Sequence, residues 1–311
     1  MEATVANVAW IDLLNPTADE GVAVGDFLGL KIPSQDEMQE IELSSRLYQE
    51  GGAEFMTMTA LANLDGEEPI KTPVTFIVKA GTLVTVRWAD PRPFQAYRQR
   101  AARQREALSS NGEEVMIGIL EALTDRTADA LEKVGNEIDV LSREVFSNRA
   151  RNVTKKTRDL RSVIEQIGKK TELLTMIQES LVSMGRLTAY HVAIDAAARR
   201  RTGNKEGRSL LKVVQRDALA LGDHSRALIG RANFLLDATL GLINLEQNQI
   251  IKIFSVAAVV FLPPTLVASI YGMNFAFMPE LQWQIGYPLA IGLMVLSAAL
   301  PYLFFKRKGW L

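Results

Sequence analysis

Two apolar segments near the end of the printed sequence constrain the fold more than any other feature. Ile253 to Tyr271 and Ile285 to Phe305 hold no charged side chain over 19 and 21 residues. At about 1.5 Å per residue, a helix of either length spans about 30 Å, the thickness of a bilayer hydrocarbon core. A buried helix of a globular protein rarely needs that length without a polar face. We therefore predict membrane helices at 253–271 and 285–305, joined by an external loop at 272–284.

The charges around these segments predict their orientation. The connecting loop holds one acidic residue, Glu280, and no basic one. Basic residues flank the segments on the other side: Lys252, Lys306, Arg307 and Lys308. Because basic residues stay on the cytoplasmic side, we expect both termini inside, with 306–311 as a basic cytoplasmic tail. The two segments and their flanking charges therefore predict a multi-pass protein of a bacterial-type inner (plasma) membrane.

Composition argues against several classes of function. The net charge of −1 gives no case for a nucleic-acid partner. The chain has no cysteine, so it has no thiolate metal site, and only His191 and His224 could supply imidazole ligands. Neither histidine has a second ligand four residues along its helix, and we interpret both as packed or solvated. No catalytic triad, phosphate loop or nucleotide fingerprint is present, which predicts a protein that is not an enzyme and needs no cofactor.

Residues 1–108 have the pattern of a mixed α/β domain. A strand is expected over 5–13, and helix starts are expected behind Pro16 and Pro33. The β-rich runs 74–78 and 82–88 flank Ala80-Gly81, which predicts a hairpin. The interpretation is a regulatory or packing domain.

Residues 109–252 have the pattern of long helices. Apolar residues recur at steps of three and four, as at Leu131, Val134 and Ile138, with breaks expected at 147–154 and 201–204. The third helix has no break before Lys252 and is expected to continue into the first membrane segment. This predicts an α+β cytosolic domain followed by a long helical stalk and two C-terminal membrane helices.

The start of the second long helix is strongly basic. A charge run is usually a solvated face, but these residues could also contact anionic lipid head groups. They are Arg149, Arg151, Lys155, Lys156 and Arg158.

One face of the first membrane helix is narrow and mostly small or polar. Such a stripe either packs helices together or lines a pore, and a single helix cannot enclose a pore, so pore lining requires several copies. Leu262 would then form an apolar constriction. The stripe consists of Asn248, Ile251, Ser255, Ala258, Leu262, Thr265 and Ser269.

The residues that follow this helix resemble a known family. They are Tyr271-Gly272-Met273-Asn274-Phe275, Met278-Pro279-Glu280-Leu281, Trp283 with Gly286-Tyr287-Pro288, and Lys306-Arg307-Lys308-Gly309-Trp310-Leu311. This pattern closely resembles the CorA family of divalent-cation channels over 244–311, with weaker similarity upstream. The resemblance implies a homopentameric funnel and passive influx of Mg²⁺, with Co²⁺ and Ni²⁺ as other permeant ions.

The same resemblance implies roles for individual residues. Gly272, Met273 and Asn274 match the selectivity entrance, where amide and carbonyl oxygens accept hydrogen bonds from the waters of hydrated Mg²⁺. Glu280 would concentrate cations at the outer mouth. Asp237 matches an acidic residue of a cytosolic Mg²⁺ site between subunits that closes the channel; its other interpretation is a salt bridge of the stalk.

Two alternatives remain open from sequence. The first is a zinc transporter of the same superfamily with proton coupling, against which Met273 argues because that branch typically carries isoleucine there. The second is a membrane-anchored helical scaffold that conducts nothing, which would not require the polar stripe.

Overall fold

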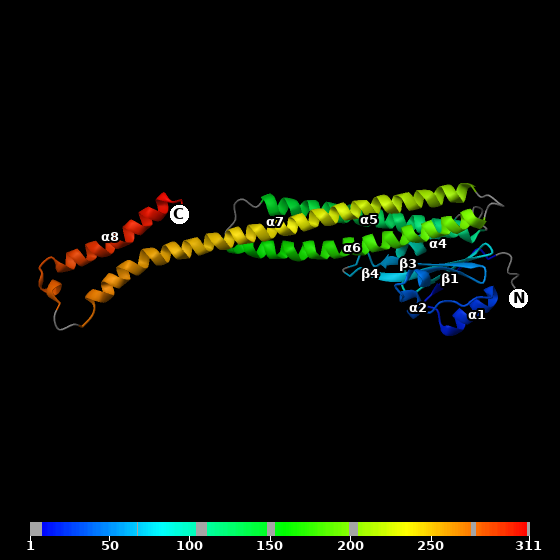
Figure 1. The fold of residues 1–311 in the computed structure, drawn as a ribbon, viewed down its shortest axis with the longest axis horizontal. Helices are drawn as coiled ribbons and strands as arrows, with labels where there is room; N and C mark the ends of the chain where they lie inside the picture. The colour runs from blue at the N-terminus through cyan, green and yellow to red at the C-terminus, as the bar shows by residue number, and fades with distance from the viewer. Residues whose placement is uncertain are drawn as a thin grey trace. The chain divides into compact units, whose positions relative to one another are not determined.

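The computed structural model describes residues 8–66, 68–103, 111–147, 153–198, 205–274 and 278–309 (Figure 1). The chain divides into two compact units. One comprises residues 1–147 with 163–236, and the other 148–162 with 237–311.

The first unit contains a five-stranded sheet. Its strands are β1 (Trp10–Leu14), β2 (Leu47–Glu50), β3 (Ala53–Ala62), β4 (Ile70–Lys79) and β5 (Thr82–Arg87), in the order β1-β5-β4-β3-β2. β1 is parallel to β5 and the other pairs are antiparallel. The predicted hairpin is confirmed: Ala80 and Gly81 have φ values of 49° and 85°, the left-handed pair that a tight two-residue hairpin turn needs. The strand predicted over 5–13 is present as β1, which begins only at Trp10; residues 8 and 9 precede it and residues 5–7 lie outside the described residues.

Helices cover both faces of this sheet (Figure 1). On one face lie α1 (Ala18–Leu28), α2 (Gln35–Gln39) and α3 (Leu43–Arg46). Capping boxes start α1 at Thr17 and α2 at Ser34, which confirms the two predicted helix starts. Their buried side chains pack with the sheet in a core that includes Leu13, Leu28, Met38, Phe55 and Ile77.

The other face carries α4 (Arg92–Arg103) and long helices. These are α5 (Gly112–Ser147), α6 (Val153–Ala198) and the first part of α7 (Lys205–Tyr271). The predicted breaks at 147–154 and 201–204 lie mostly outside the described residues. The seam of Leu131, Val134 and Ile138 in α5 is buried as expected. Of the predicted lipid-contacting residues, Arg149 and Arg151 lie outside the described residues, and so do the side chains of Lys155, Lys156 and Arg158.

A fully buried arginine ties β1 to β5. Arg87 has no exposed surface, and its guanidinium makes two hydrogen bonds to the Asp12 carboxylate, of 2.9 and 2.7 Å. A third, of 2.5 Å, goes to Asp90 Oδ1, and the Phe94 ring centroid lies 4.5 Å from the guanidinium carbon. Burial alone would lower the pKa of Arg87, but the carboxylates of Asp12 and Asp90 raise it. The guanidinium therefore stays protonated.

A buried histidine joins the sheet to the helices. His191 in α6 is 3 % exposed, and its Nδ1 lies 2.6 Å from Glu54 Oε2 of β3. Its Nε2 lies 3.6 Å from Glu113 Oε1 at the start of α5, which is an ion-pair contact too long for a hydrogen bond. The structure thus confirms the packed interpretation for His191, while His224 is exposed. Burial alone would lower the pKa of His191, whereas the two glutamates raise it to about 9.

This cluster predicts a loss of stability in mild alkali. The folded-state pKa of His191 is raised from 6.5 to about 9. The contribution of protonated His191 to the free energy of unfolding is therefore complete below pH 6.5 and disappears as pH rises towards 9. Denaturant unfolding of the protein at pH 6, 7.5 and 9 measures this free energy. His191→Gln should flatten this dependence, whereas His224→Gln, at the exposed histidine, should keep it. An unchanged profile in His191→Gln would contradict the assignment.

The second unit contains the C-terminal part of α7, a short 3-10 helix η2 (Pro279–Gln282) and α8 (Gly286–Arg307). Two described helices hold segments long and apolar enough to cross a membrane, Ser209–Tyr271 within α7 and Gly286–Arg307. Most large apolar side chains on these segments are exposed; Phe254 and Phe261, for example, are about 70 % exposed. Such surfaces suit a lipid or protein environment.

Candidate functional site: the end of α7 and the loop to α8

The polar stripe lies on an uninterrupted helix. α7 continues without a break through the whole range from Asn248 to Ser269. All seven stripe residues are exposed in the single chain, including the large apolar members Ile251 (61 %) and Leu262 (65 %). The chain therefore does not cover its own stripe, which leaves this face open to water or to other copies of the protein.

Two consecutive prolines mark the middle of this segment. Pro263 and Pro264 lie inside α7 and have no N–H, so the carbonyls of Val259 and Val260 lose their usual helical donors. Thr265, one of the stripe residues, donates its hydroxyl to the Phe261 carbonyl at 2.7 Å. Carbonyls freed inside a membrane helix are tolerated beside protein or a water-filled cavity, and both fit a helix that faces a pore.

The predicted entrance follows the last turn of α7. The Gly272 amide donates to Ala268 O at 2.9 Å, and the Met273 amide donates to Ile270 O at 3.2 Å. A β-carbon on Gly272 would lie 3.1 Å from Ala268 O, which is closer than most real contacts. Met273 and Asn274 are exposed directly after this turn in the single chain. Phe275 lies outside the described residues.

The loop back to α8 depends on a glycine that the sequence interpretation did not assign a role. The Trp283 amide donates to Glu280 O at 3.3 Å, and the Gly286 amide donates to Trp283 O at 3.0 Å. A β-carbon on Gly286 would lie 2.3 Å from Glu280 O, a backbone atom that cannot move aside cheaply. Its sequence signal was the run Gly286-Tyr287-Pro288, which begins α8.

Substituting Gly286 should therefore displace the loop that carries Glu280. In Gly286→Ala the new methyl group must push the Glu280 carbonyl away, and we expect Mg²⁺ uptake in proteoliposomes to fall at least about threefold if that loop shapes the outer mouth. Gly292→Ala in α8 is the matched control, because a β-carbon there meets no atom within 4 Å. Equal uptake by the two variants would show that the close contact has no consequence for transport.

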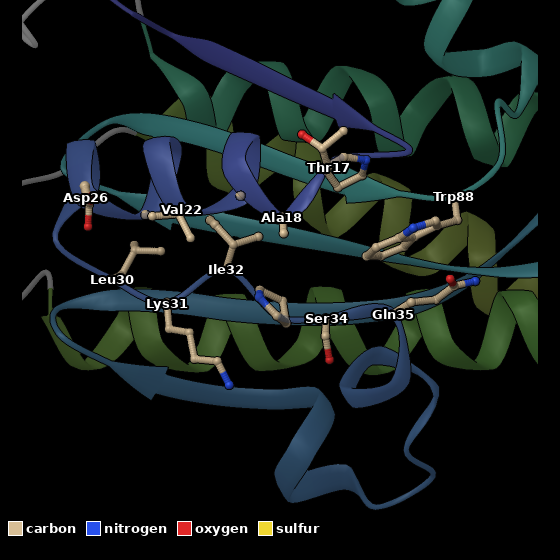
Figure 2. Close-up of a pocket in the computed structure, with 14 residues that line it drawn as sticks. Thr17, Ala18, Val22, Asp26, Leu30, Lys31, Ile32, Ser34, Gln35 and Trp88 are labelled. Atoms are coloured by element: carbon tan, nitrogen blue, oxygen red, sulfur yellow. The ribbon is translucent and has the colours of Figure 1, made fainter.

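The first unit supplies no competing ion site among the residues that the structure describes. No group of three or more His, Asp or Glu side chains there is placed to hold a metal ion. Figure 2 shows a pocket of about 590 Å³ beside α1, walled mainly by apolar residues such as Val22, Ile32 and Trp88. Lys31 at its edge pairs with Glu37 at 2.5 Å. Asp237 is exposed on α7 and belongs to no such group among the described residues.

The fold and this site define a class, an integral membrane protein with an α+β N-terminal domain, long helices and two apolar C-terminal helices. The chain belongs to the family described as CorA-like Mg2+ transporter protein, which matches residues 5–307. This confirms the resemblance found in the sequence. Because the family is one of ion transporters, the prediction of a protein that is not an enzyme and needs no cofactor is also confirmed.

Curated relatives and a solved structure agree with this family. The chain is 35 % identical to Magnesium transport protein CorA of Escherichia coli (strain K12) over 311 residues, covering 99 % of this chain and 93 % of the relative. It is 36 % identical to the protein of the same name from Salmonella typhimurium over 313 residues, with the same coverage. The complete CorA magnesium transporter structure from Methanocaldococcus jannaschii superposes with a TM-score of 0.76 at 22 % identity, covering 97 % of this chain and 91 % of that chain. The predicted fold class is confirmed.

Proposed function

We propose that this protein is a Mg²⁺ transporter in which several copies of α7 surround an ion pathway that opens at Gly272-Met273-Asn274. The observation that carries the proposal is the exposed stripe on one unbroken helix that ends at this motif. The near full-length relatives named as magnesium transport proteins support Mg²⁺ as the ion and disfavour a zinc transporter or a non-conducting scaffold.

The chemistry of Mg²⁺ suits a neutral entrance. The ion gives up its octahedral waters reluctantly, so an entrance that strips them would be slow. A ring of Asn274 amide oxygens can instead accept hydrogen bonds from those waters, and Glu280 raises the local cation concentration. A neutral ring also releases the ion readily. Two positive charges that enter across a potential of about 100 mV, inside negative, gain roughly 4.6 kcal/mol, so influx needs no ATP.

The proposed assembly is a homopentamer with both termini in the cytoplasm. Symmetry would bring the seven stripe positions of each chain to a common axis, with Ile251 and Leu262 forming apolar constrictions and the small and polar residues facing water. α8 would form an outer ring in contact with lipid. In this arrangement the loop 272–284 lies outside an inner membrane, and the basic residues at the start of α6 approach anionic head groups.

Ion-resolved flux tests the proposal. Purified protein in proteoliposomes should take up Mg²⁺ in response to an inside-negative potential, with Co²⁺ and Ni²⁺ as further permeant ions. A pH gradient alone should drive no uptake. Transport of Zn²⁺ in preference to Mg²⁺, or uptake that requires a proton gradient, would favour the zinc branch instead. If none of these ions is transported at any membrane potential, the non-conducting scaffold would be favoured.

Regulation by internal Mg²⁺ is proposed to involve Asp237. A carboxylate exposed on α7 can share Mg²⁺ with a neighbouring subunit, whose ligands complete the site. Asp237→Ala should weaken inhibition of uptake by Mg²⁺ inside the vesicle about tenfold, since one charged ligand is lost. Asp223→Ala, at another exposed aspartate of α7, is the matched control. An unchanged inhibition curve for Asp237→Ala would remove this residue from the regulatory site.

A further inference from the structure

A second, larger hollow of about 740 Å³ lies within the first unit. It is formed by α6, by the strands β3 and β4, and by the segment from α2 to α3. Most of its lining residues are polar or charged, whereas those of the pocket in Figure 2 are mainly apolar. The lining residues are Gln39, Ile41, Arg46, Thr59, Lys71, Thr72, Pro73, Gln178, Glu179, Val182, Ser183 and Arg186.

The lining carries an excess of positive charge. Three of its side chains are basic and one, Glu179, is acidic. Lys71 Nζ pairs with Glu179 Oε2 at 2.7 Å, which neutralises one basic group. Arg46 and Arg186 remain, and neither forms an ion pair with a carboxylate in the described part of the chain. A hollow with a net positive charge stands out in a protein whose net charge is −1.

Arg46 is held in place without a counter-charge. Its Nε donates to Glu40 O at 2.6 Å, and one terminal nitrogen donates to Thr59 Oγ1 at 3.3 Å, so the half-buried guanidinium has a fixed orientation. Arg46 and Arg186 both line the hollow, and burial together with the positive charge of Arg186 lowers the pKa of Arg46. Two like charges held together favour an anion between them.

The floor of the hollow is a fixed contact between the sheet and α6. The Thr59 amide donates to Ser183 Oγ at 3.0 Å, and the Ser183 hydroxyl also approaches Thr59 O at 3.3 Å and Ser180 O at 2.8 Å. The two arginines come from different elements, Arg46 from α3 and Arg186 from α6. An anion bound by both would therefore join the sheet layer to the long helices.

We infer that this hollow is a binding site for a phosphate-bearing small anion, with Arg46 and Arg186 as its principal ligands. Guanidinium groups recognise phosphate oxygens by paired, charge-assisted hydrogen bonds, and Thr72, Gln39 and Gln178 supply further polar groups on the walls. The space is much larger than a single phosphate needs and suits a di- or polyphosphate. The exposed apolar side chains Ile41 and Val182 give an organic portion a surface to contact.

Calorimetric titration of the full-length protein in detergent tests this site. Pyrophosphate, inorganic phosphate and ATP are titrated separately in Mg²⁺-free buffer at low salt. We expect saturable binding of pyrophosphate that is tighter than that of phosphate and weakens with added salt, because the contacts are ionic. Equal affinity for pyrophosphate and ATP would mean that the phosphate chain alone is recognised. Tighter ATP binding would mean that the organic portion also contributes.

Three variants locate the binding. Arg186→Gln and Arg46→Gln should each weaken pyrophosphate binding about tenfold or more, since each removes a charge-assisted contact. Arg186 is exposed, so its substitution leaves the fold intact even if Arg46→Gln perturbs α3. Arg226→Gln is the matched control, an exposed arginine elsewhere that pairs with Asp223 at 3.0 Å. Absence of saturable binding, or wild-type affinity in Arg186→Gln, would overturn the assignment.

Discussion

Replacing Asn274 with alanine is expected to abolish Mg²⁺ uptake while leaving the assembled protein intact. Asn274 is exposed immediately after the last turn of α7, so its amide has no structural task that the described contacts reveal. In a symmetric assembly the substitution removes one hydrogen-bonding amide from every subunit at once. Hydrogen bonds to charged groups contribute roughly 1.5–3 kcal/mol each, so uptake should fall at least about tenfold even if one bond per ion is lost.

The control must separate the entrance from the rest of the loop. Gln284→Ala removes an exposed amide from the same loop without touching the motif, and it should transport like the wild type. Both variants are compared by uptake into proteoliposomes and by size-exclusion chromatography. Wild-type uptake by Asn274→Ala would refute the entrance role, and a changed oligomer would attribute the loss to assembly.

Removing the carboxylate of Asp12 should destabilise the N-terminal domain by about 3–5 kcal/mol, because it leaves a buried arginine without its main partner. Arg87 has no contact with solvent, and Asp12 accepts two of its hydrogen bonds. Asp90 keeps one of the other bonds, so part of the network survives. Denaturant unfolding of Asp12→Ala followed by tryptophan fluorescence measures the loss, because Trp10 and Trp88 lie within or next to these strands.

A paired substitution separates the cost of a stranded charge from the worth of the ion pair. Asp12→Leu with Arg87→Leu removes both charges, and apolar replacement of a buried pair is often neutral, so the double variant should be more stable than Asp12→Ala. Asp19→Ala, in the exposed first turn of α1, should cost less than about 1 kcal/mol. If Asp12→Ala unfolds like the wild type, Arg87 is not held by this carboxylate.

Sequence patterns predicted the local structure because local structure depends on near neighbours. The Ala80-Gly81 hairpin, the capped starts of α1 and α2 and the buried seam of α5 all follow from residues a few positions apart. The parallel pairing of β1 with β5 was not predicted, because it joins residues more than 70 positions apart. β2 and β3 were not predicted either. β3 is buried on both faces and so lacks a clear alternation of polar and apolar residues.

The buried charges were also beyond sequence reasoning. Arg87 ends a β-rich run, where a basic residue normally reaches solvent, and only the distant Asp12 explains its burial. His191 was interpreted as packed or solvated; sequence could not decide between the two because its partners Glu54 and Glu113 lie far away in the chain. Gly286 illustrates the same limit, since the Glu280 carbonyl that excludes a side chain is defined by the fold of the loop. The roles of the stripe, the Gly-Met-Asn entrance and Asp237 stay predictions.

The continuity of α7 makes the stripe sensitive to the count of residues before it. Each residue of a helix turns the next by about 100° and advances it by about 1.5 Å, and no loop within Lys205–Tyr271 can absorb an extra one. A single residue inserted between Leu235 and Asn248 would therefore rotate every downstream stripe position by about 100° relative to the buried face upstream. An insertion of seven would restore the angular phase to within about 20°. The length of this segment, and not only its composition, is thus part of what the sequence encodes.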